Sequence, residues 1–294
     1  MPFRGELSAF LTACFWTGSA MLFASATKWA GSFQVNITRL ILAAAYLALL
    51  VVLAGLDLTM SPSQILNLSL SGIVGLSLGD TFLFRAFREI GARVTMLIMS
   101  LAPAIAAGLA YCIVGETLSI AGIAGISATV LGICIVILDR RPAGTPGVTA
   151  SGILYAVLAA TGQGAGLVLA KMAFRESVIN GFVATFVRII ASIIVLLPVA
   201  MMTKRYVHPY RMYREQAKAF WLTAAGSILG PFLGISFSLI AIEYTKVGVA
   251  ATIMALVPVL MLPLVRIVYK EQLSWRAILG AFVAVGGVGV LFLR

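Results

Sequence analysis

Three ionisable residues, Arg39, Asp80 and Arg188, interrupt stretches of sequence that are otherwise apolar. A charged side chain at the centre of a lipid bilayer costs roughly 3 kcal/mol on insertion scales, so it persists where it is paired or has a function. Arg39 and Asp80 are expected to lie at the same membrane depth and to form an ion pair. This pair would act either as a structural clamp or as a gate that responds to a proton or a substrate.

Arg188 occupies the same place in the second half of the chain as Arg39 does in the first, but Ile235 stands where Asp80 would be repeated. The Arg188 side chain therefore has two interpretations. It can extend along its helix toward the lipid headgroups, near Glu176 or Glu243. Alternatively, it can meet an anionic group of a bound substrate.

Several uncharged residues in the apolar stretches are candidates to line a pathway for a small molecule. Trp16 and Gln163, which match at an offset of 147 positions, offer a ring and an amide for ligand contact. Packing and an interhelical hydrogen bond explain them equally well. Serines in helices more often bond their own backbone, and methionines often fill cores. The candidate pathway residues are Trp16, Ser19, Asp80, Met99, Ser100, Gln163, Ser236 and Met254.

Pro103 and Pro258 also lie inside apolar stretches. A proline in a helix removes a backbone hydrogen bond and can bend the helix. These bends would be either hinges for a conformational change or static features. Farther along the chain, Ser119 is expected to cap a helix, so Glu116 is expected to fix a turn at the membrane surface rather than carry out chemistry.

The amino-acid composition predicts the secondary-structure elements that position these residues. The 294-residue chain is 61% hydrophobic and 11% charged, whereas about a quarter of the residues in soluble proteins are charged. A helix needs about 20 apolar residues to cross a bilayer, and continuous apolar runs favour helices over a closed barrel. We therefore predict an all-α integral membrane protein with ten transmembrane helices, at 7–27, 34–54, 64–86, 93–113, 118–138, 150–171, 180–201, 218–243, 248–268 and 274–292.

The two halves of the chain are related in sequence. Glycines, prolines and acids recur at an offset of 155 positions, as in Gly75 and Gly230. This repeat predicts two five-helix domains, 1–141 and 142–294. Because five is odd, the second repeat enters the membrane from the opposite side and is inverted. Inverted repeats are typical of transporters, in which they place a substrate site near the bilayer midplane.

The motifs of both halves resemble those of the drug/metabolite transporter superfamily, and in particular its EamA-type members. The motifs are an early arginine in the second helix, GDTF at 79–82 followed by RA at 85–86, LAP at 101–103 leading to GETLS at 115–119, and VP at 257–258 leading to KEQLS at 270–274. The resemblance covers essentially the whole chain. It implies a secondary carrier, often an exporter of amino acids or other metabolites, with a central cavity lined by the first, third, fourth, sixth, eighth and ninth helices.

Other classes of function are disfavoured. The net charge of +11 resides mostly in short loops, which argues against a nucleic-acid surface. A second membrane aspartate is missing, and the single histidine, His208, lies in a basic loop, so we predict no enzyme, no metal site and no cofactor. No glycine-rich loop of the Lys-Ser/Thr type occurs, which excludes direct use of ATP.

The sequence thus predicts a secondary-active transporter that exports amino acids or related small metabolites by alternating access. The alternative is an exporter of drugs or other cationic compounds from the same superfamily. Drug exporters of this kind often use a carboxylate deep in the first helix, where this chain has only Glu6 at the edge. The expected partners are the lipid bilayer, a small-molecule substrate and, through Asp80, protons as the coupling ion. We expect a monomer.

The predicted location is the plasma (inner) membrane. With Arg39 and Arg188 set aside, fourteen lysines and arginines fall on the side of the loops after the odd-numbered helices, and five fall on the side of both termini. The positive-inside rule then places both termini outside the cytoplasm. The resemblance implies the opposite, because EamA-type proteins are usually drawn with cytoplasmic termini.

Overall fold

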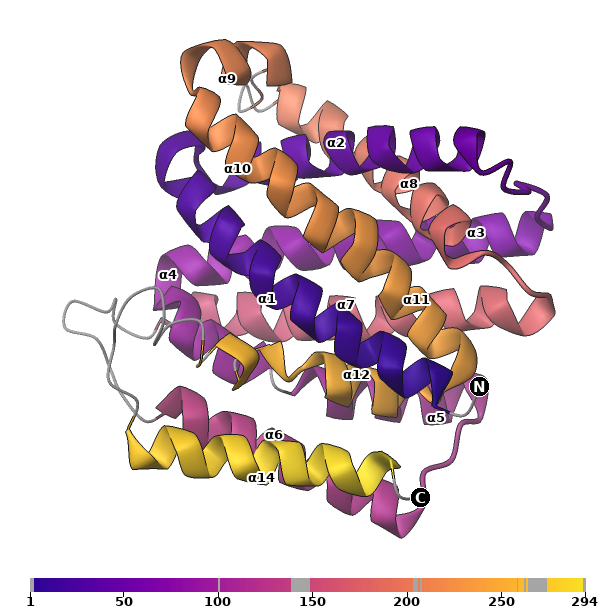
Figure 1. Ribbon diagram of the computed structural model, residues 1–294, viewed down its shortest axis with the longest axis vertical. Helices are drawn as coiled ribbons and strands as arrows, with labels where there is room; N and C mark the ends of the chain where they lie inside the picture. The colour runs from indigo at the N-terminus through magenta and orange to yellow at the C-terminus, as the bar shows by residue number, and fades with distance from the viewer. Residues whose placement is uncertain are drawn as a thin grey trace.

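The computed structural model describes residues 3–99, 101–138, 149–202, 206, 208–257, 259–261, 263 and 274–292, and these residues contain no strand. All regular secondary structure in this part of the chain is helical (Figure 1). They are α1 (Arg4–Ala30), α2 (Ser32–Leu53), α3 (Pro62–Gly72), η1 (Ile73–Gly79), α4 (Asp80–Met99), α5 (Ala102–Val114), α6 (Ile120–Leu138), α7 (Ala150–Glu176), α8 (Gly181–Met202), α9 (Pro209–Glu215), α10 (Ala217–Ser227), η2 (Ile228–Gly234), α11 (Ile235–Tyr244), α12 (Val247–Met254) and α14 (Trp275–Phe292).

The predicted all-α membrane fold is confirmed. Within the described residues, six helices are long and apolar enough to cross a bilayer, and four shorter apolar helices accompany them. Local signals set several helix starts. Ser61 and Gln64 form a reciprocal capping box ahead of α3, and the Ser119 hydroxyl accepts a hydrogen bond from the Gly122 amide (3.1 Å) at the start of α6, as predicted.

One predicted boundary is wrong. The sequence suggested a loop between helices at 64–86 and 93–113, but α4 continues through that region to Met99. Residues 87–92 contain no proline, and a single glycine is tolerated within a helix. The helix ends instead at Met99, and α5 begins at Ala102, directly before Pro103. Pro103 has no amide hydrogen to bond the carbonyl of Met99, so the regular helix ends there.

The same interruption occurs in the second half. The Leu101 amide bonds the carbonyl of Ile98, and the Leu256 amide bonds the carbonyl of Ile253, each over three residues instead of four. The two sites are 155 positions apart, which is the offset of the sequence repeat. Both halves therefore carry a discontinuous helix at the same place.

A second irregularity is repeated as well. The π-helical segments η1 and η2 begin at Ile73 and Ile228 and end at Gly79 and Gly234, again 155 positions apart. The π-helix is rare, and it is frequently found at functional sites. Each π-helical segment lies between two α-helical segments of one long helix, η1 between α3 and α4 and η2 between α10 and α11. Each half therefore has a wider helical turn within a membrane-spanning helix.

Packing between the halves is reciprocal. In Figure 1, α1 of the first half lies along α10, η2 and α11, and α7 of the second half lies along α3, η1 and α4. A Cβ added at Gly75 would lie 3.8 Å from the Gly166 Cα atom, and one at Gly230 would lie 3.3 Å from the Ser19 Cβ atom. Ser19 and Gly166 match at the offset of 147 that relates Trp16 to Gln163. The contacts therefore repeat with the partners exchanged, as inverted halves require.

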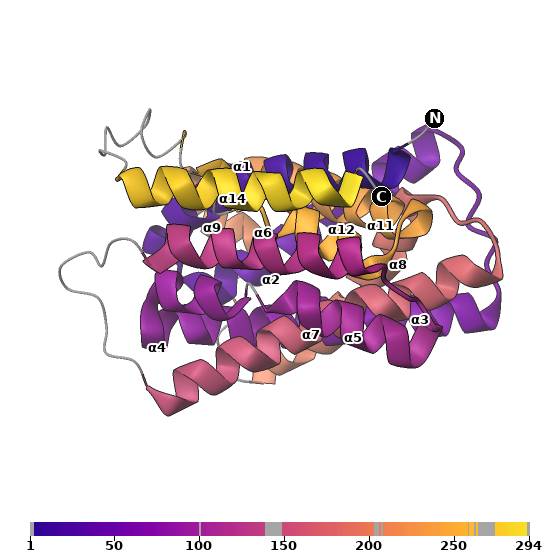
Figure 2. The same cartoon turned by 90° about the horizontal axis from the view of Figure 1, so that it is seen from below.

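The helices α6 and α14 form a pair at one face of the bundle (Figure 2). A Cβ at Gly132 would lie 2.3 Å from the Ala284 amide nitrogen, and one at Gly287 would lie 2.6 Å from the Thr129 nitrogen. Small residues of this kind let membrane helices approach closely. The offset of 155 relates these two contacts to each other. From Thr129 to Gly132 the residue number rises along α6, while that of the partner falls from Gly287 to Ala284 along α14, so the two helices are antiparallel.

Candidate functional site

The predicted pair of intramembrane charges is present. An Arg39 Nη2 donor and the Asp80 Oδ2 atom form an ion pair that joins α2 to the first residue of α4, directly after η1. Arg39 Nε also donates to Asn36 Oδ1 (2.9 Å). The Arg39 guanidinium lies 5.5 Å from the centre of the Phe23 ring and 5.7 Å from that of Phe84. Ion pairing, a hydrogen bond and two aromatic faces thus hold this cation in an apolar region.

The interpretation that Arg188 extends toward the headgroups is wrong. Arg188 is only 4% exposed, and it interacts electrostatically with Asp80. One acid suggested as its headgroup-level partner, Glu176, instead accepts hydrogen bonds from Ser61 (2.7 Å) and Ser63 (2.5 Å). Asp80 therefore pairs directly with Arg39 and also attracts the buried cation of Arg188 electrostatically.

Glycines explain why Arg188 is buried. A Cβ at Gly72 would lie 2.1 Å from the Arg188 carbonyl oxygen, so the backbones of α3 and α8 meet at this point. A Cβ at Gly75 would lie 3.4 Å from Arg188 Nη2, which places the guanidinium against η1. The Arg188 Nε atom has no hydrogen-bond partner among the described residues.

Three of the predicted pathway residues, Trp16, Ser19 and Ser236, lie next to η2. The Trp16 ring lies against Gly234 at the end of η2, where a Cβ would be 2.5 Å from the ring nitrogen. Ser19 donates to the Trp16 carbonyl (3.1 Å), and Ser236 donates to the Phe232 carbonyl (2.6 Å). Both serines thus bond their own helix backbone. Gln163 is half-buried in α7.

Met99, Met254 and Pro103 lie at the helix interruptions. Met99 is the last residue of α4 and is half-buried, and Met254 is the last residue of α12 and is 1% exposed. Pro103 is buried in the first turn of α5. Ser100 and Pro258 lie outside the described residues. Both methionines therefore end a helix segment at matching interruptions.

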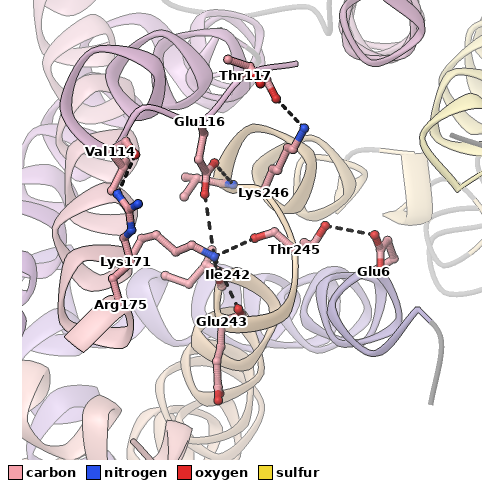
Figure 3. Close-up of polar contacts among 11 residues, drawn as sticks. Glu6, Val114, Glu116, Thr117, Lys171, Arg175, Ile242, Glu243, Thr245 and Lys246 are labelled. Atoms are coloured by element: carbon pink, nitrogen blue, oxygen red, sulfur yellow. Dashed lines mark hydrogen bonds and ion pairs between the residues drawn. The ribbon is translucent and has the colours of Figure 1, made fainter. Parts of the chain in front are cut away.

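A second polar cluster, which joins the two halves, lies at the end of the bundle where α1 begins (Figure 3). The Glu116 Oε2 atom, just after α5, accepts a hydrogen bond from the Val247 amide (2.8 Å) at the start of α12. Glu116 Oε1 lies 3.7 Å from the Lys171 ammonium near the end of α7. Glu116 thus fixes a turn, as predicted, but the turn that it fixes belongs to the other half.

Lys171 holds the carboxyl end of α11. Its ammonium donates to the carbonyl oxygens of Ile242, Glu243 (3.4 Å) and Thr245 (3.2 Å) (Figure 3). Cations are stabilised at helix carboxyl ends, where carbonyls lack intrahelical partners. The Thr245 hydroxyl in turn donates to Glu6 Oε1 (3.0 Å) on α1.

Two further cations complete this cluster. Lys246 donates to the Thr117 carbonyl (2.5 Å), and Arg175 donates to the Val114 carbonyl (2.6 Å). The ends of α1, α5, α7, α11 and α12 are therefore tied together by polar contacts. The cluster connects the first and second halves at one end of the molecule.

Comparison with known proteins agrees with this architecture. The model of the family described as the EamA-like transporter family matches the chain twice, over residues 3–138 and 150–293. The chain belongs to the EamA-like transporter family. A solved crystal structure superposes on this EamA-like protein with a TM-score of 0.80 at 20% sequence identity, covering 100% of this chain and 98% of that chain. A search of curated proteins found no match to this chain.

Family membership fixes the class of function. This EamA-like protein is a multi-pass membrane transporter of the drug/metabolite transporter superfamily, and the family is not one of enzymes. Its surroundings are a lipid bilayer and its cargo is a small molecule. The boundary predicted at 141/142 lies outside the described residues and stays a prediction.

The cluster around Glu116 in the EamA-like protein was not predicted from the sequence. The charge count by membrane side includes Lys171, Arg175 and Lys246 only among the five cations on the side of the termini. Their positions directly after long apolar segments were the available signal, because a lysine there can bond the free carbonyls of a neighbouring helix. Which helix end lies within reach depends on packing, and the sequence alone does not specify it.

An open groove of about 530 Å³ lies near the same end of the EamA-like protein, between the first turns of α1 and α8 and the end of α11. Its polar lining comes mainly from Arg4, Ser8, Asn180 and Glu243. Neither Asp80 nor the two membrane arginines line it. The groove is therefore separate from the intramembrane charges.

Proposed function

We propose that this protein is a secondary-active exporter of amino acids or related small metabolites, and that it works by alternating access. The observation that carries the proposal is the matched pair of helix interruptions, which are placed 155 positions apart in inverted halves. Discontinuous helices of inverted repeats typically form the substrate site of a transporter near the midplane. The π-helical segment η1, which lies beside the intramembrane charges, and its match η2 support the same location.

The charges favour metabolites over the alternative substrates, which are cationic drugs. Asp80 pairs with Arg39 and also attracts Arg188 electrostatically, so these three residues together carry an excess of one positive charge. A cationic compound would be repelled from it. Asp80 is the carboxylate that a coupled proton would reach, and protonation would release Arg39.

The cluster around Glu116 supplies the closed end that alternating access requires. It connects helices of both halves through Lys171 and Val247, so separation of the halves at this end must break it. In the other conformation, the opposite end would close while this end opens. We place the transporter in the plasma (inner) membrane as a monomer.

Transport by purified protein in liposomes tests the proposal. A thermal-shift screen of amino acids and related metabolites would select ligands, and counterflow of each radiolabelled ligand would then be measured. Saturable counterflow that unlabelled substrate inhibits is expected. The exposed, extramembrane Glu215→Gln variant should transport like the wild type. Single-channel currents, or no counterflow with any ligand that binds, would contradict the proposal.

A further inference from the structure

The guanidinium of Arg188 is a buried cation whose hydrogen-bonding capacity the protein does not fully use. The residue is 4% exposed, and its Nε atom has no hydrogen-bond partner among the described residues. A guanidinium carries five N–H donors. A buried donor without an acceptor costs free energy, so a ligand that accepts its hydrogen bonds is favoured at this place.

The charge of Arg188 is also incompletely balanced. Asp80 is the charged group with which Arg188 interacts, but that carboxylate already forms the ion pair with Arg39. Two cations and one anion leave an excess of one positive charge within the membrane. Such a charge is costly unless it is paired, and a carboxylate group on a bound ligand would pair with it.

The Arg188 guanidinium lies between the two halves of the protein, against glycine-rich backbone, as expected for a group that binds a transported ligand. Arg188 Nη2 lies against Gly75, where the Cα atom of Gly166 and the carbonyl of Gly162 are both 3.8 Å from an added Cβ. The surrounding residues of η1 and α7 thus contribute backbone in place of bulky side chains. Arg188 belongs to the second half and η1 to the first, so a ligand here would contact both halves.

We propose that Arg188 binds the carboxylate of the transported amino acid or related metabolite through charge-assisted hydrogen bonds from its guanidinium. This assignment rests on the proposed transport function and names the chemical group by which the substrate is recognised. Arg39 has a different task, because it neutralises Asp80 and so leaves the positive charge of Arg188 for the substrate.

The first test needs no variant. The wild type is titrated with L-amino acids and with the matching amino-acid amides, in which a neutral group replaces the carboxylate, and the dissociation constant is obtained from thermal shifts. The amides should bind at least about tenfold more weakly, since hydrogen bonds to charged groups exceed those between neutral groups. Equal binding of acids and amides would overturn the assignment.

The second test compares two arginine variants in the absence of ligand. Arg188→Met removes the incompletely balanced charge, so its melting temperature should equal or exceed that of the wild type. Arg39→Met leaves Asp80 without its partner and should melt at a lower temperature. If Arg188→Met is as destabilised as Arg39→Met, or does not fold, Arg188 is a structural partner of Asp80 and the assignment is wrong.

Arg188→Lys supplies a second binding variant. It retains the charge but lacks the planar fork of the guanidinium, so amino acids should bind about tenfold more weakly at unchanged melting temperature. Unaltered affinity would count against the assignment. A melting temperature that rises with chloride as much as with amino acids, with no preference for acids over amides, would identify a free inorganic anion and would also overturn it.

The two proposals fail in different ways. If no amino acid shows counterflow, but carboxylates bind the purified protein and lose affinity in Arg188→Lys, then the transport proposal fails and the carboxylate site stands. If counterflow is robust, but the amides compete as well as the acids and Arg188→Lys transports normally, then the carboxylate site fails and the transport proposal stands.

Discussion

At the scale of single residues, the interior of the bundle is organised by one carboxylate and two guanidiniums. Asp80 and Arg39 are only 17% and 12% exposed at their side chains. Burial of an ion pair gives little net stability, but removal of one partner leaves an uncompensated charge and is strongly destabilising. Asp80 is therefore the side chain on which the stability of this region depends most.

Asp80→Asn should lower the free energy of unfolding by about 3 kcal/mol, because both arginines lose their counter-charge. Chemical or thermal unfolding in detergent would measure the loss. The double variant Arg39→Gln/Asp80→Asn should lose less than the sum of the two single variants, since neither charge of the pair then remains.

Arg211 provides the control for this prediction. It pairs with Glu215 at the surface, where the two side chains are 70% and 52% exposed. Arg211→Gln should change the stability by less than about 1 kcal/mol. If Asp80→Asn has as small an effect as this variant and also leaves transport unaltered, neither the clamp nor the gate interpretation is tenable.

At the scale of helices, close approach of backbones decides where side chains lie. The contact between Gly72 and the Arg188 carbonyl has no room for a Cβ atom. The α3 and α8 helices would have to separate to accept one. The location of Arg188 therefore depends on a residue that has no side chain.

Gly72→Ala should reduce the yield of folded protein and its melting temperature, because the clash is with backbone and overpacking costs roughly 1–3 kcal/mol or more. Gly108→Ala is the matched control. A Cβ at Gly108 meets nothing within 4 Å, so that variant should be neutral or slightly stabilised. Equal melting temperatures for the two variants would show that α3 and α8 do not approach so closely.

The cluster around Glu116 makes a separate prediction for α12. In Glu116→Ala, the Val247 amide loses its acceptor, so the first amides of α12 should exchange hydrogen at least about tenfold faster. Hydrogen–deuterium exchange with mass spectrometry would measure the rate. Glu215→Ala should leave α12 unchanged. Unaltered exchange in Glu116→Ala would mean that Glu116 does not hold the start of this helix.

The sequence predicted the pairing of Arg39 with Asp80 because each lies a known distance along an apolar helix, and helix rise converts that position into depth. It did not predict the burial of Arg188, which depends on the contact at Gly72 between helices distant in sequence. The π-helical segments also escaped prediction, since a shift of backbone hydrogen bonds changes no residue pattern. Once η1 is known, however, the offset of 155 predicts η2.

At the scale of the whole molecule, the distribution of lysines and arginines between the two ends of the bundle predicts how the protein is oriented in the membrane. Most lysines and arginines fall on the side opposite the termini, and α1 begins and α14 ends at the same end of the bundle (Figure 1). From the positive-inside rule we propose that the Glu116 cluster lies on the face away from the cytoplasm. This orientation would make the cluster the outer closure.

Fusions to the C-terminus test this orientation. Alkaline phosphatase, which is active only outside the cytoplasm, should be active, and green fluorescent protein exported to that side should stay dark. Fusions placed after residue 215, in the basic segment that follows α8, should behave oppositely. Fluorescent C-terminal fusions together with inactive phosphatase would reverse the assignment and move the Glu116 cluster to the cytoplasmic face.

The antiparallel pair of α6 and α14 lies on the axis that relates the halves, since the contact of Gly132 with Ala284 maps onto that of Gly287 with Thr129. An exchange of conformations between the halves converts each of these contacts into the other and so leaves the pair unchanged. In the proposed alternating-access cycle, we therefore expect this pair to stay in place while the remaining helices move. A covalent cross-link between α6 and α14 would be compatible with turnover, whereas one between Glu116 and Val247 would arrest it.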